Sequence, residues 1–346
     1  MEEIHVPRFG FAWLLAVAVL LSLSGCGGGS SSASTSVDVY VAGAQMQGAN
    51  YAAVYWKNGT PVVLSDKSYA TSLAVSGSDV YVSGYGFGGT HQVAEYWKDG
   101  NSFALTDGTN DAIATSIVIS GSDVYIAGFE DTTVSPISSF ARYWKNGSAV
   151  NLTDGTQQAW GNDIAVSGSD VYVAGDERNA AGHYVAKYWK NGVETVLSDG
   201  TSDVLANSIA VSGSDVYVAG WSQNEAVYWK NGSLVTLTQG NVTEMGTGIA
   251  ISGSDVYVCG YQEVGTTNSI AKYWKNGAAV ALSDGTSPLY GSSIALSGSD
   301  VYVAGSDNAI SSATEKPALY WKNGTAVYLT TGTPMALASK IIVVQQ

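Results

Sequence analysis

One phrase recurs seven times along this chain and constrains its fold more than any other feature. The phrase is Asp-Val-Tyr-Val, with Ile as the fourth residue of the third copy, followed by a small residue and Gly. The copies begin at Asp38, Asp79, Asp123, Asp170, Asp215, Asp255 and Asp300. A second phrase, Tyr-Trp-Lys-Asn-Gly, follows each copy of the first, with Asp in place of Asn in the copy that starts at Tyr96. The spacing of 40 to 47 residues between copies is typical of repeat architectures, in which each unit folds by packing on its neighbours.

Each repeat contains four short apolar runs separated by turn residues. In the fifth copy these runs are 208–213, 215–220, 226–232 and 233–240. They are rich in Val, Ile, Tyr, Trp and Thr and show no helical periodicity, so they predict β-strands. Asn-Gly between the third and fourth runs predicts a hairpin turn, and Ser-Gly-Ser-Asp predicts a second tight turn between the first and second.

Four antiparallel strands in about 40–45 residues are typical of a propeller blade. Alternation along the second run places Val216 and Val218 on one face of the blade and Tyr217 and Ala219 on the other. Both faces are apolar because a neighbouring blade covers each. The Trp that occurs once per repeat is expected to fill the layers between blades rather than to stack on a ligand.

The two ends of the repeat region complement each other. The first copy lacks the run that precedes Asp-Val-Tyr-Val elsewhere, whereas the chain ends with such a run at 339–344 and no further copy. We therefore expect an all-β, seven-bladed β-propeller of four-stranded antiparallel blades, closed by pairing of the C-terminal strand with the N-terminal blade. The repeats resemble those of bacterial seven-bladed propeller proteins over residues 37–346 and lack the Gly-His and Trp-Asp signature of the WD-repeat class. The resemblance implies the fold and no defined activity.

The N-terminus has a different composition. Arg8 precedes an apolar run of about 15 residues, which is short for a membrane span and typical of an export signal, although Glu2 and Glu3 are unusual there. The run ends in Leu23-Ser24-Gly25-Cys26, which resembles the lipobox of bacterial lipoproteins. That resemblance implies cleavage before Cys26 and acylation of Cys26. A plain secretory signal remains the alternative.

These features divide the chain into three parts. Residues 1–25 are expected to be the signal peptide, 26–36 the lipidated Cys26 with a flexible Gly/Ser tether, and 37–346 the propeller. The protein is then exported and anchored to the bacterial cell envelope, at the outer membrane or cell surface, with the lipid bilayer as a partner. Cys259 replaces Ala or Ser of the repeat and is expected to be a buried free thiol.

Composition and motif searches exclude several classes of function. The formal charge is −14 with no basic run, so a nucleic-acid partner is not expected. His91 and His183 are the only histidines beyond residue 25, and no metal, nucleotide or hydrolase motif includes either one. The Gly-x-Gly-x-x-Gly match at 84–89 is followed by no helix. The acidic segments 106–111, 153–158 and 198–203 are interpreted as turns rather than calcium sites, so we predict no cofactor and no metal.

The strand order puts two kinds of connection on opposite rims of the propeller. The repeated Ser-Gly-Ser-Asp and Asn-Gly turns form one rim, here called the scaffold rim. The connections after Asp-Val-Tyr-Val-Ala-Gly and between blades form the other, here called the variable rim, where specificity can reside. The candidate ligand-binding residues are Tyr85, Phe87, Phe129, Trp160, Asp176, Arg178, His183, Trp221, Tyr261 and Tyr290. Four of the seven residues after the final Gly of the phrase are aromatic, and we expect this position to ring the mouth of the central channel.

Three hypotheses for function follow. The first is a non-catalytic module that binds an unknown protein partner, because seven similar blades suit binding better than a single catalytic centre. The second is a lectin-like protein that binds a glycan through the aromatic residues. The third is a carbohydrate-active hydrolase or lyase that uses Asp176 or Glu177 together with His183 as acid and base. The sequence leans against catalysis without deciding it.

Overall fold

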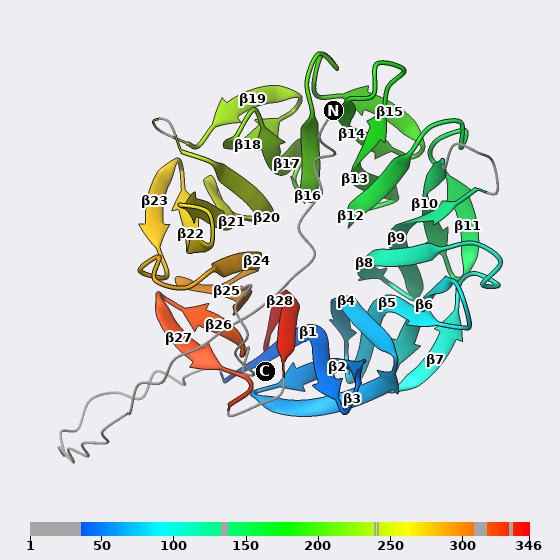
Figure 1. Cartoon of the computed structure of the whole chain (residues 1–346), viewed down its shortest axis with the longest axis horizontal. Helices are drawn as coiled ribbons and strands as arrows, with labels where there is room; N and C mark the ends of the chain where they lie inside the picture. The colour runs from blue at the N-terminus through cyan, green and yellow to red at the C-terminus, as the bar shows by residue number, and fades with distance from the viewer. Residues whose placement is uncertain (1–35, 133–137, 239, 241, 308–316, 332–334) are drawn as a thin grey trace.

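The computed structural model describes residues 36–132, 138–238, 240, 242–307, 317–331 and 335–346. These residues form seven four-stranded antiparallel sheets arranged around a central axis (Figure 1). No helix long and apolar enough to cross a membrane occurs among them. The expected propeller is therefore confirmed.

The innermost strand of each blade lines the central channel. These inner strands are β4 (Ser68–Ser76), β8 (Ala112–Ser120), β12 (Ala159–Ser167), β16 (Val204–Ser212), β20 (Glu244–Ser252), β24 (Leu289–Ser297) and β28 (Ala336–Gln345). The second strands carry the Asp-Val-Tyr-Val phrase. They are β1 (Val37–Gln47), β5 (Asp79–Phe87), β9 (Asp123–Asp131), β13 (Asp170–Arg178), β17 (Asp215–Ser222), β21 (Asp255–Val264) and β25 (Asp300–Asp307).

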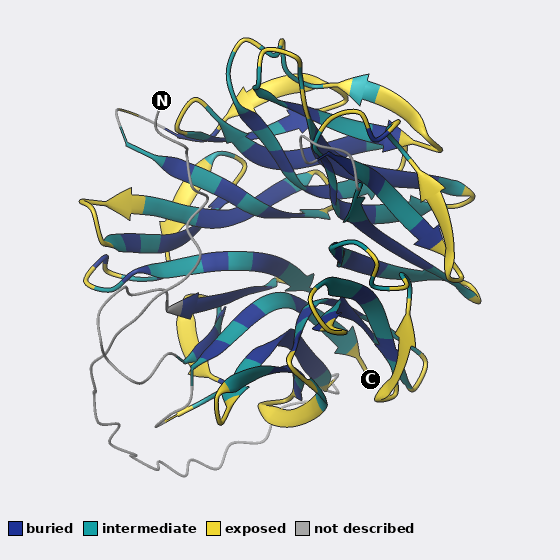
Figure 2. Cartoon of the chain, turned by 45° about the vertical axis from the view of Figure 1, so that its right-hand side comes forward, coloured by how far each residue is buried: buried dark blue, intermediate teal, exposed yellow. Residues whose placement is uncertain are grey.

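The third and fourth strands complete each blade toward the outside. The third strands are β2 (Asn50–Lys57), β6 (Gln92–Lys98), β10 (Ser139–Lys145), β14 (Tyr184–Lys190), β18 (Glu225–Lys230), β22 (Asn268–Lys275) and β26 (Ala318–Lys322). The outer strands are β3 (Thr60–Asp66), β7 (Asn101–Ala104), β11 (Ser148–Asn151), β15 (Val193–Val196), β19 (Ser233–Thr236), β23 (Ala278–Ala281) and β27 (Thr325–Tyr328). Exposed residues concentrate in these outer strands and in the turns (Figure 2).

The ring closes as the repeat pattern predicts. Blade 1 has the strand order β28-β1-β2-β3, and blades 2 to 7 follow in chain order. The strand β28 pairs with β1 over nine residue pairs, among them Val39 with Val343 and Val41 with Ile341. Pairing the two ends of the chain leaves no free edge at the junction.

Packing between blades follows from strand alternation. Val216 and Val218 belong to the core cluster between blades 4 and 5, whereas Tyr217 and Ala219 belong to the cluster between blades 5 and 6. The repeated Trp fills these layers, and each of the seven is at most 2% exposed. They are Trp56, Trp97, Trp144, Trp189, Trp229, Trp274 and Trp321.

The repeated phrases meet on the scaffold rim. In blade 1, Asp38 lies 2.8 Å from the Nζ of Lys57, which also sits over the ring of Tyr40. The turn residue Asn58 has φ of 51°, donates through Nδ2 to Asp38 and accepts from the N–H of Val39 through Oδ1. The side chain of Asn58 thus joins the second strand to the turn, while its amide tolerates the positive φ that a type I′ turn requires.

The aspartate–lysine pair recurs in every blade at 2.7–2.9 Å. Blade 2 differs because Asp99 replaces the turn asparagine. Its Oδ1 still accepts from Val80 N–H at 2.9 Å, but a carboxylate cannot donate to Asp79. The same interaction network therefore occurs in all seven blades of the scaffold rim, with one hydrogen bond missing in blade 2.

Candidate functional site

The candidate residues of the variable rim were expected in loops, but most of them lie at strand ends. Nine of the ten belong to second or inner strands, and His183 lies in the connection before β14. We expected the residue after the final Gly of the phrase to ring the mouth of the central channel. This residue instead lies in the second strand of each blade, one strand farther from the axis than the inner strands that line the channel. The structure groups the candidate aromatic residues other than Trp221 at three blade boundaries.

The first group spans blades 1 and 2. The ring of Tyr69 lies 5.0 Å from Tyr51 and 5.1 Å from Tyr85, and the Tyr69–Tyr85 pair is stacked at 13°. Phe87 meets Tyr85 edge-on at 6.0 Å and is 47% exposed. Burial raises the pKa of Tyr51 to about 12, with a smaller contribution from Tyr69. Four rings from three strands therefore form one aromatic surface at the rim.

The second group spans blades 3 and 4. Phe129 meets Trp160 at 6.2 Å, and Trp160 lies 5.3 Å from Tyr184. The guanidinium of Arg178 lies 5.6 Å from the centre of the Tyr184 ring and donates to the carbonyl of Gly182 and to Gln158. This group combines an aromatic surface with a cation.

The third group spans blades 6 and 7. Tyr261 and Tyr290 meet edge-on at 4.3 Å, and the hydroxyl of Tyr261 lies 3.5 Å from the sulfur of Met245. Burial is the main cause that raises the pKa of Tyr261. Trp221 is half-buried in β17 and pairs across the sheet with Leu205 and Ala226, apart from all three groups.

Asp176 and His183, the residues weighed for acid–base chemistry, have different partners. Asp176 is 3% exposed, accepts from Ala206 N–H at 2.6 Å and from Asn162 Nδ2 at 2.8 Å, and so links blades 4 and 5. Burial raises its pKa to about 7, although both hydrogen bonds lower it. The Nδ1 of His183 lies 3.6 Å from Asp203. Within the described part of the chain, no interaction joins Asp176 to His183.

The acidic segments between blades act as turns. In four of them, one aspartate oxygen accepts from both the N–H and the hydroxyl of the threonine two residues later. The aspartates are Asp107, Asp154, Asp199 and Asp284. Across the described ranges, no group of three or more His, Cys, Asp or Glu is placed to hold a metal ion. Cys259 is a buried free cysteine as expected, and burial raises the pKa of its thiol to about 12.

A polar ring in the central channel was missed by the sequence analysis. Each inner strand carries a bulge about midway along its length, and the bulged residue is always Thr, Asn or Ser. These residues are Thr71, Thr115, Asn162, Asn207, Thr247, Ser292 and Ser339. Six of them donate to a backbone carbonyl of the next blade at 2.6–2.9 Å, from Thr71 to Ala114 through to Ser292 to Ala338. These bonds link neighbouring blades around the axis.

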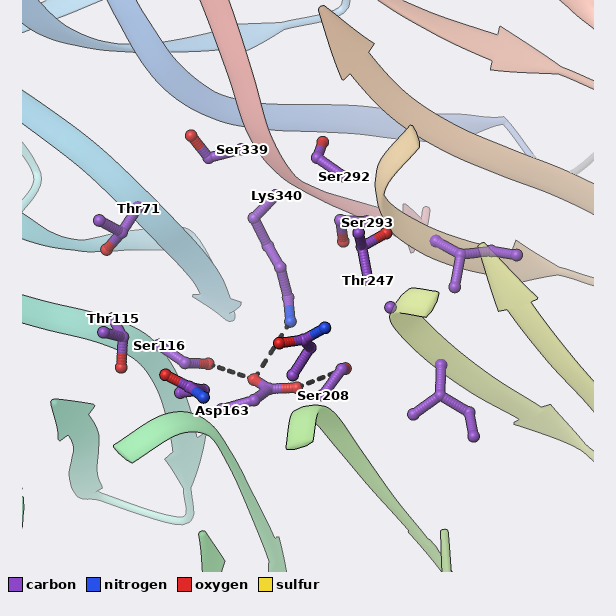
Figure 3. A pocket seen from close by; sticks show the side chains of 15 residues that line it. Thr71, Thr115, Ser116, Asp163, Ser208, Thr247, Ser292, Ser293, Ser339 and Lys340 are labelled. Atoms are coloured by element: carbon purple, nitrogen blue, oxygen red, sulfur yellow. Dashed lines mark hydrogen bonds and ion pairs between the residues drawn. The ribbon is translucent and has the colours of Figure 1, made fainter. Parts of the chain in front are cut away.

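The residue that follows each bulge is small in five blades and charged in the other two. It is Ser in four blades and Gly in one, but it is Asp163 in blade 4 and Lys340 in blade 1. The two side chains reach across the channel, with Lys340 Nζ 3.4 Å from Asp163 Oδ1 (Figure 3). Aligning the inner strands by position would have exposed this pair of charged exceptions.

Asp163 accepts hydrogen bonds from three further donors besides Lys340. Ser116 and Ser208 donate to it at 2.6 and 2.7 Å, and Ile209 N–H donates at 3.0 Å. Burial alone would raise the pKa of Asp163, but the charge of Lys340 and these hydrogen bonds together hold it below its usual value. Around this pair the channel leaves a cavity of about 110 Å³, lined by the seven bulged residues and by six of the residues that follow them.

Comparisons with known proteins support the fold. The β-propeller domain of the Trilobed protease from Pyrococcus furiosus, described as having an open velcro topology, matches with a TM-score of 0.50 and 13% identity over 85% of this chain and 94% of that one. Pyrococcus horikoshii acylaminoacyl peptidase matches at 12% identity with a TM-score of 0.48, over 85% of this chain. The present chain spans about half the length of that peptidase (50%). No protein-family model matches the sequence, and no curated protein matches it either.

What the Trilobed protease domain shares with the chain is the β-propeller fold. At such low identity the likeness extends to the fold and to nothing in the site, since one propeller supports many unrelated functions. The present ring differs from the open topology described for the Trilobed protease domain, because β28 pairs with β1. The protein is a seven-bladed β-propeller closed by its own C-terminal strand.

Proposed function

We propose that this protein is a lipid-anchored, extracytoplasmic binding module that recognises a protein partner through its variable rim. The observation that carries the proposal is the contrast between the two rims. The scaffold rim repeats one aspartate–lysine network seven times, whereas the variable rim presents three aromatic groups that differ in composition. Aromatic side chains and arginine are the residue types enriched where proteins bind partners.

The location rests on the N-terminal sequence. Leu23-Ser24-Gly25-Cys26 supports an acylated Cys26, and this residue lies outside the described residues. The tether joins β1 at Val37, which lies at the scaffold-rim end of that strand. A tether on that rim turns the variable rim away from the membrane.

Glycan binding is the second candidate, and the exposed aromatic group of blades 1 and 2 favours it. Aromatic surfaces with nearby polar groups suit the apolar faces and hydroxyls of sugars. Phe87 is the most exposed member of this group. A glycan array with the purified protein distinguishes the two candidates. Saturable sugar binding that is lost in Phe87→Ala would favour a glycan as the ligand over a protein partner.

A site-specific photo-crosslinker tests the main proposal in intact cells. Phe87 on the variable rim and Phe103 on an outer strand are similarly exposed, at 47% and 44%, so they form a matched pair of insertion sites. We expect a discrete crosslinked product from position 87 and none from position 103. Further insertion sites on the variable rim are Tyr261 and Trp221. Binding at the variable rim is contradicted if positions 87 and 103 give equal products, or if none of positions 87, 261 and 221 gives a product.

The anchor has its own test. Cys26→Ser is expected to move the protein from the membrane fraction to the soluble fraction and to abolish labelling by a palmitate analogue. Retention in the membrane fraction without Cys26 would refute the lipid anchor and leave the question of the binding surface unaffected.

A further inference from the structure

We propose that the central channel is a second binding site, separate from the variable rim, for a small hydroxylated carboxylate held by Lys340. Three features of the channel carry this inference: a lysine with one long contact, an aspartate that has three shorter hydrogen bonds besides that lysine, and a ring of side chains that offer hydrogen-bond acceptors.

Lys340 is loosely paired compared with the seven lysines of the scaffold rim. The seven lysines of the scaffold rim approach their aspartates to 2.7–2.9 Å, whereas Lys340 Nζ is 3.4 Å from Asp163. This is the only polar contact of Lys340 Nζ within the described ranges, and the side chain is 28% exposed. An ammonium group has three donors, so most of its hydrogen-bonding capacity faces the cavity.

Asp163 does not depend on Lys340 for its hydrogen bonds. Ser116, Ser208 and the N–H of Ile209 all donate to its carboxylate at 3.0 Å or less. The shorter bonds are therefore those to the neighbouring inner strands, and the lysine is available to an added anion. A carboxylate placed on Lys340 would accept a shorter charge-assisted hydrogen bond than the 3.4 Å bond that Lys340 makes to Asp163.

The bulged residues set the rest of the ligand chemistry. The hydroxyls of Thr115 and Thr247 donate their single hydrogen to carbonyls of the next blade, so they present lone pairs to any ligand. The amides of Asn162 and Asn207 are likewise used as donors through Nδ2, which leaves Oδ1 as an acceptor. A ligand that fits must carry an anionic acceptor for Lys340 and hydroxyl donors for this ring.

The cavity volume of about 110 Å³ suits an occupant of a few heavy atoms.

Isothermal titration calorimetry with the full chain in detergent tests the site with three probes of similar size. D-glycerate carries a carboxylate and two hydroxyls, propionate lacks the hydroxyls and glycerol lacks the carboxylate. We expect saturable binding of D-glycerate, and binding at least tenfold weaker for propionate and glycerol. Lys340→Ser, which restores the serine of other blades, is expected to weaken D-glycerate binding roughly tenfold or more, because hydrogen bonds to charged groups are the strong ones.

Two variants guard against loss of folding and nonspecific charge effects. The double variant Lys340→Ser with Asp163→Ser removes both channel charges and should also lose binding while it unfolds at a temperature close to the wild type. Lys67→Asn removes an exposed lysine at a positive φ that Asn tolerates, and should bind D-glycerate normally. The proposal is overturned by unchanged binding in Lys340→Ser, by equal binding of propionate or glycerol, or by no saturable binding to the folded wild type. Phe87→Ala should leave this binding intact, so the outcome is independent of the variable rim.

Discussion

Asp176 should make this protein less stable as the pH rises toward neutrality. Its carboxyl is fully buried between blades 4 and 5, with Ala206 N–H and Asn162 as donors and no cation among its partners. Its pKa in the folded protein is about 7, against an ordinary value of 3.8, and burial is the main cause. Between these two values the folded protein holds a proton that the unfolded chain has released. The free energy of unfolding must therefore fall as the pH rises, because the unfolded chain binds fewer protons.

The magnitude follows from the size of the shift. One pKa unit corresponds to about 1.4 kcal/mol, so a shift of about three units corresponds to roughly 4 kcal/mol lost between pH 4 and pH 7. The matched variant is Asp176→Ser. Ser306 occupies the equivalent position in blade 7 and accepts from Ala338 N–H at 2.7 Å, so a serine can take over the bond from Ala206 without a charge.

Urea unfolding followed by tryptophan fluorescence at pH 4 and pH 8 measures the effect. Asp176→Ser is expected to be more stable than the wild type at pH 8, and the difference should shrink toward pH 4 where the wild-type carboxyl is neutral. Asp131, whose pKa burial raises to about 6, is present in both proteins and cancels in the comparison. The same pH dependence in both proteins, or lower stability of the variant at pH 8, would refute the assignment of a buried neutral carboxyl.

Three further predictions concern the core, the scaffold rim and the channel. Trp229→Ala should destabilise the protein by about 3–5 kcal/mol in chemical denaturation, because the ring is 2% exposed and its removal leaves a cavity between blades. Asp99→Asn should raise the midpoint of thermal unfolding, since the new amide can donate to Asp79 as the other turn asparagines do to their aspartates; an unchanged or lower midpoint would mean that this bond does not form. Asp163→Ala should cost about 3–5 kcal/mol in urea unfolding, because Lys340 and three donors lose their partner, and a cost below 1 kcal/mol would show that water replaces the carboxylate.

Much of the scaffold was predictable because its determinants are local. Asn58 and Gly59 take the positive φ values of 51° and 81° that a type I′ turn demands, and the turn fixes the pairing of the third and fourth strands. Alternation of Val218 and Tyr217 assigns each side chain to a blade face, since strand periodicity is two. The unpaired inner strand at the C-terminus predicted the closure of the ring for the same reason.

The sites were harder to predict because they depend on packing between repeats. Tyr69 and Tyr85 stack because the inner and second strands of blade 2 are adjacent, and Tyr51 joins them from blade 1. Asp176 was expected to face a ligand, yet it lies between blades because its strand position points toward β16. Charged residues are mostly exposed in proteins, so sequence alone predicts exposure for Asp176. Its burial depends on the residues that pack around it in the folded protein.

The repeat, the four strands of each blade, their turns and the seven-bladed ring follow from local sequence, because they depend on residue periodicity and on φ preferences. The contact across the channel between Asp163 and Lys340, 177 residues apart in the chain, follows instead from the three-dimensional fold. Their contact depends on the closing of the ring, which brings the last strand of the chain opposite blade 4. A distance set by closure of the whole ring appears in no local pattern of residues.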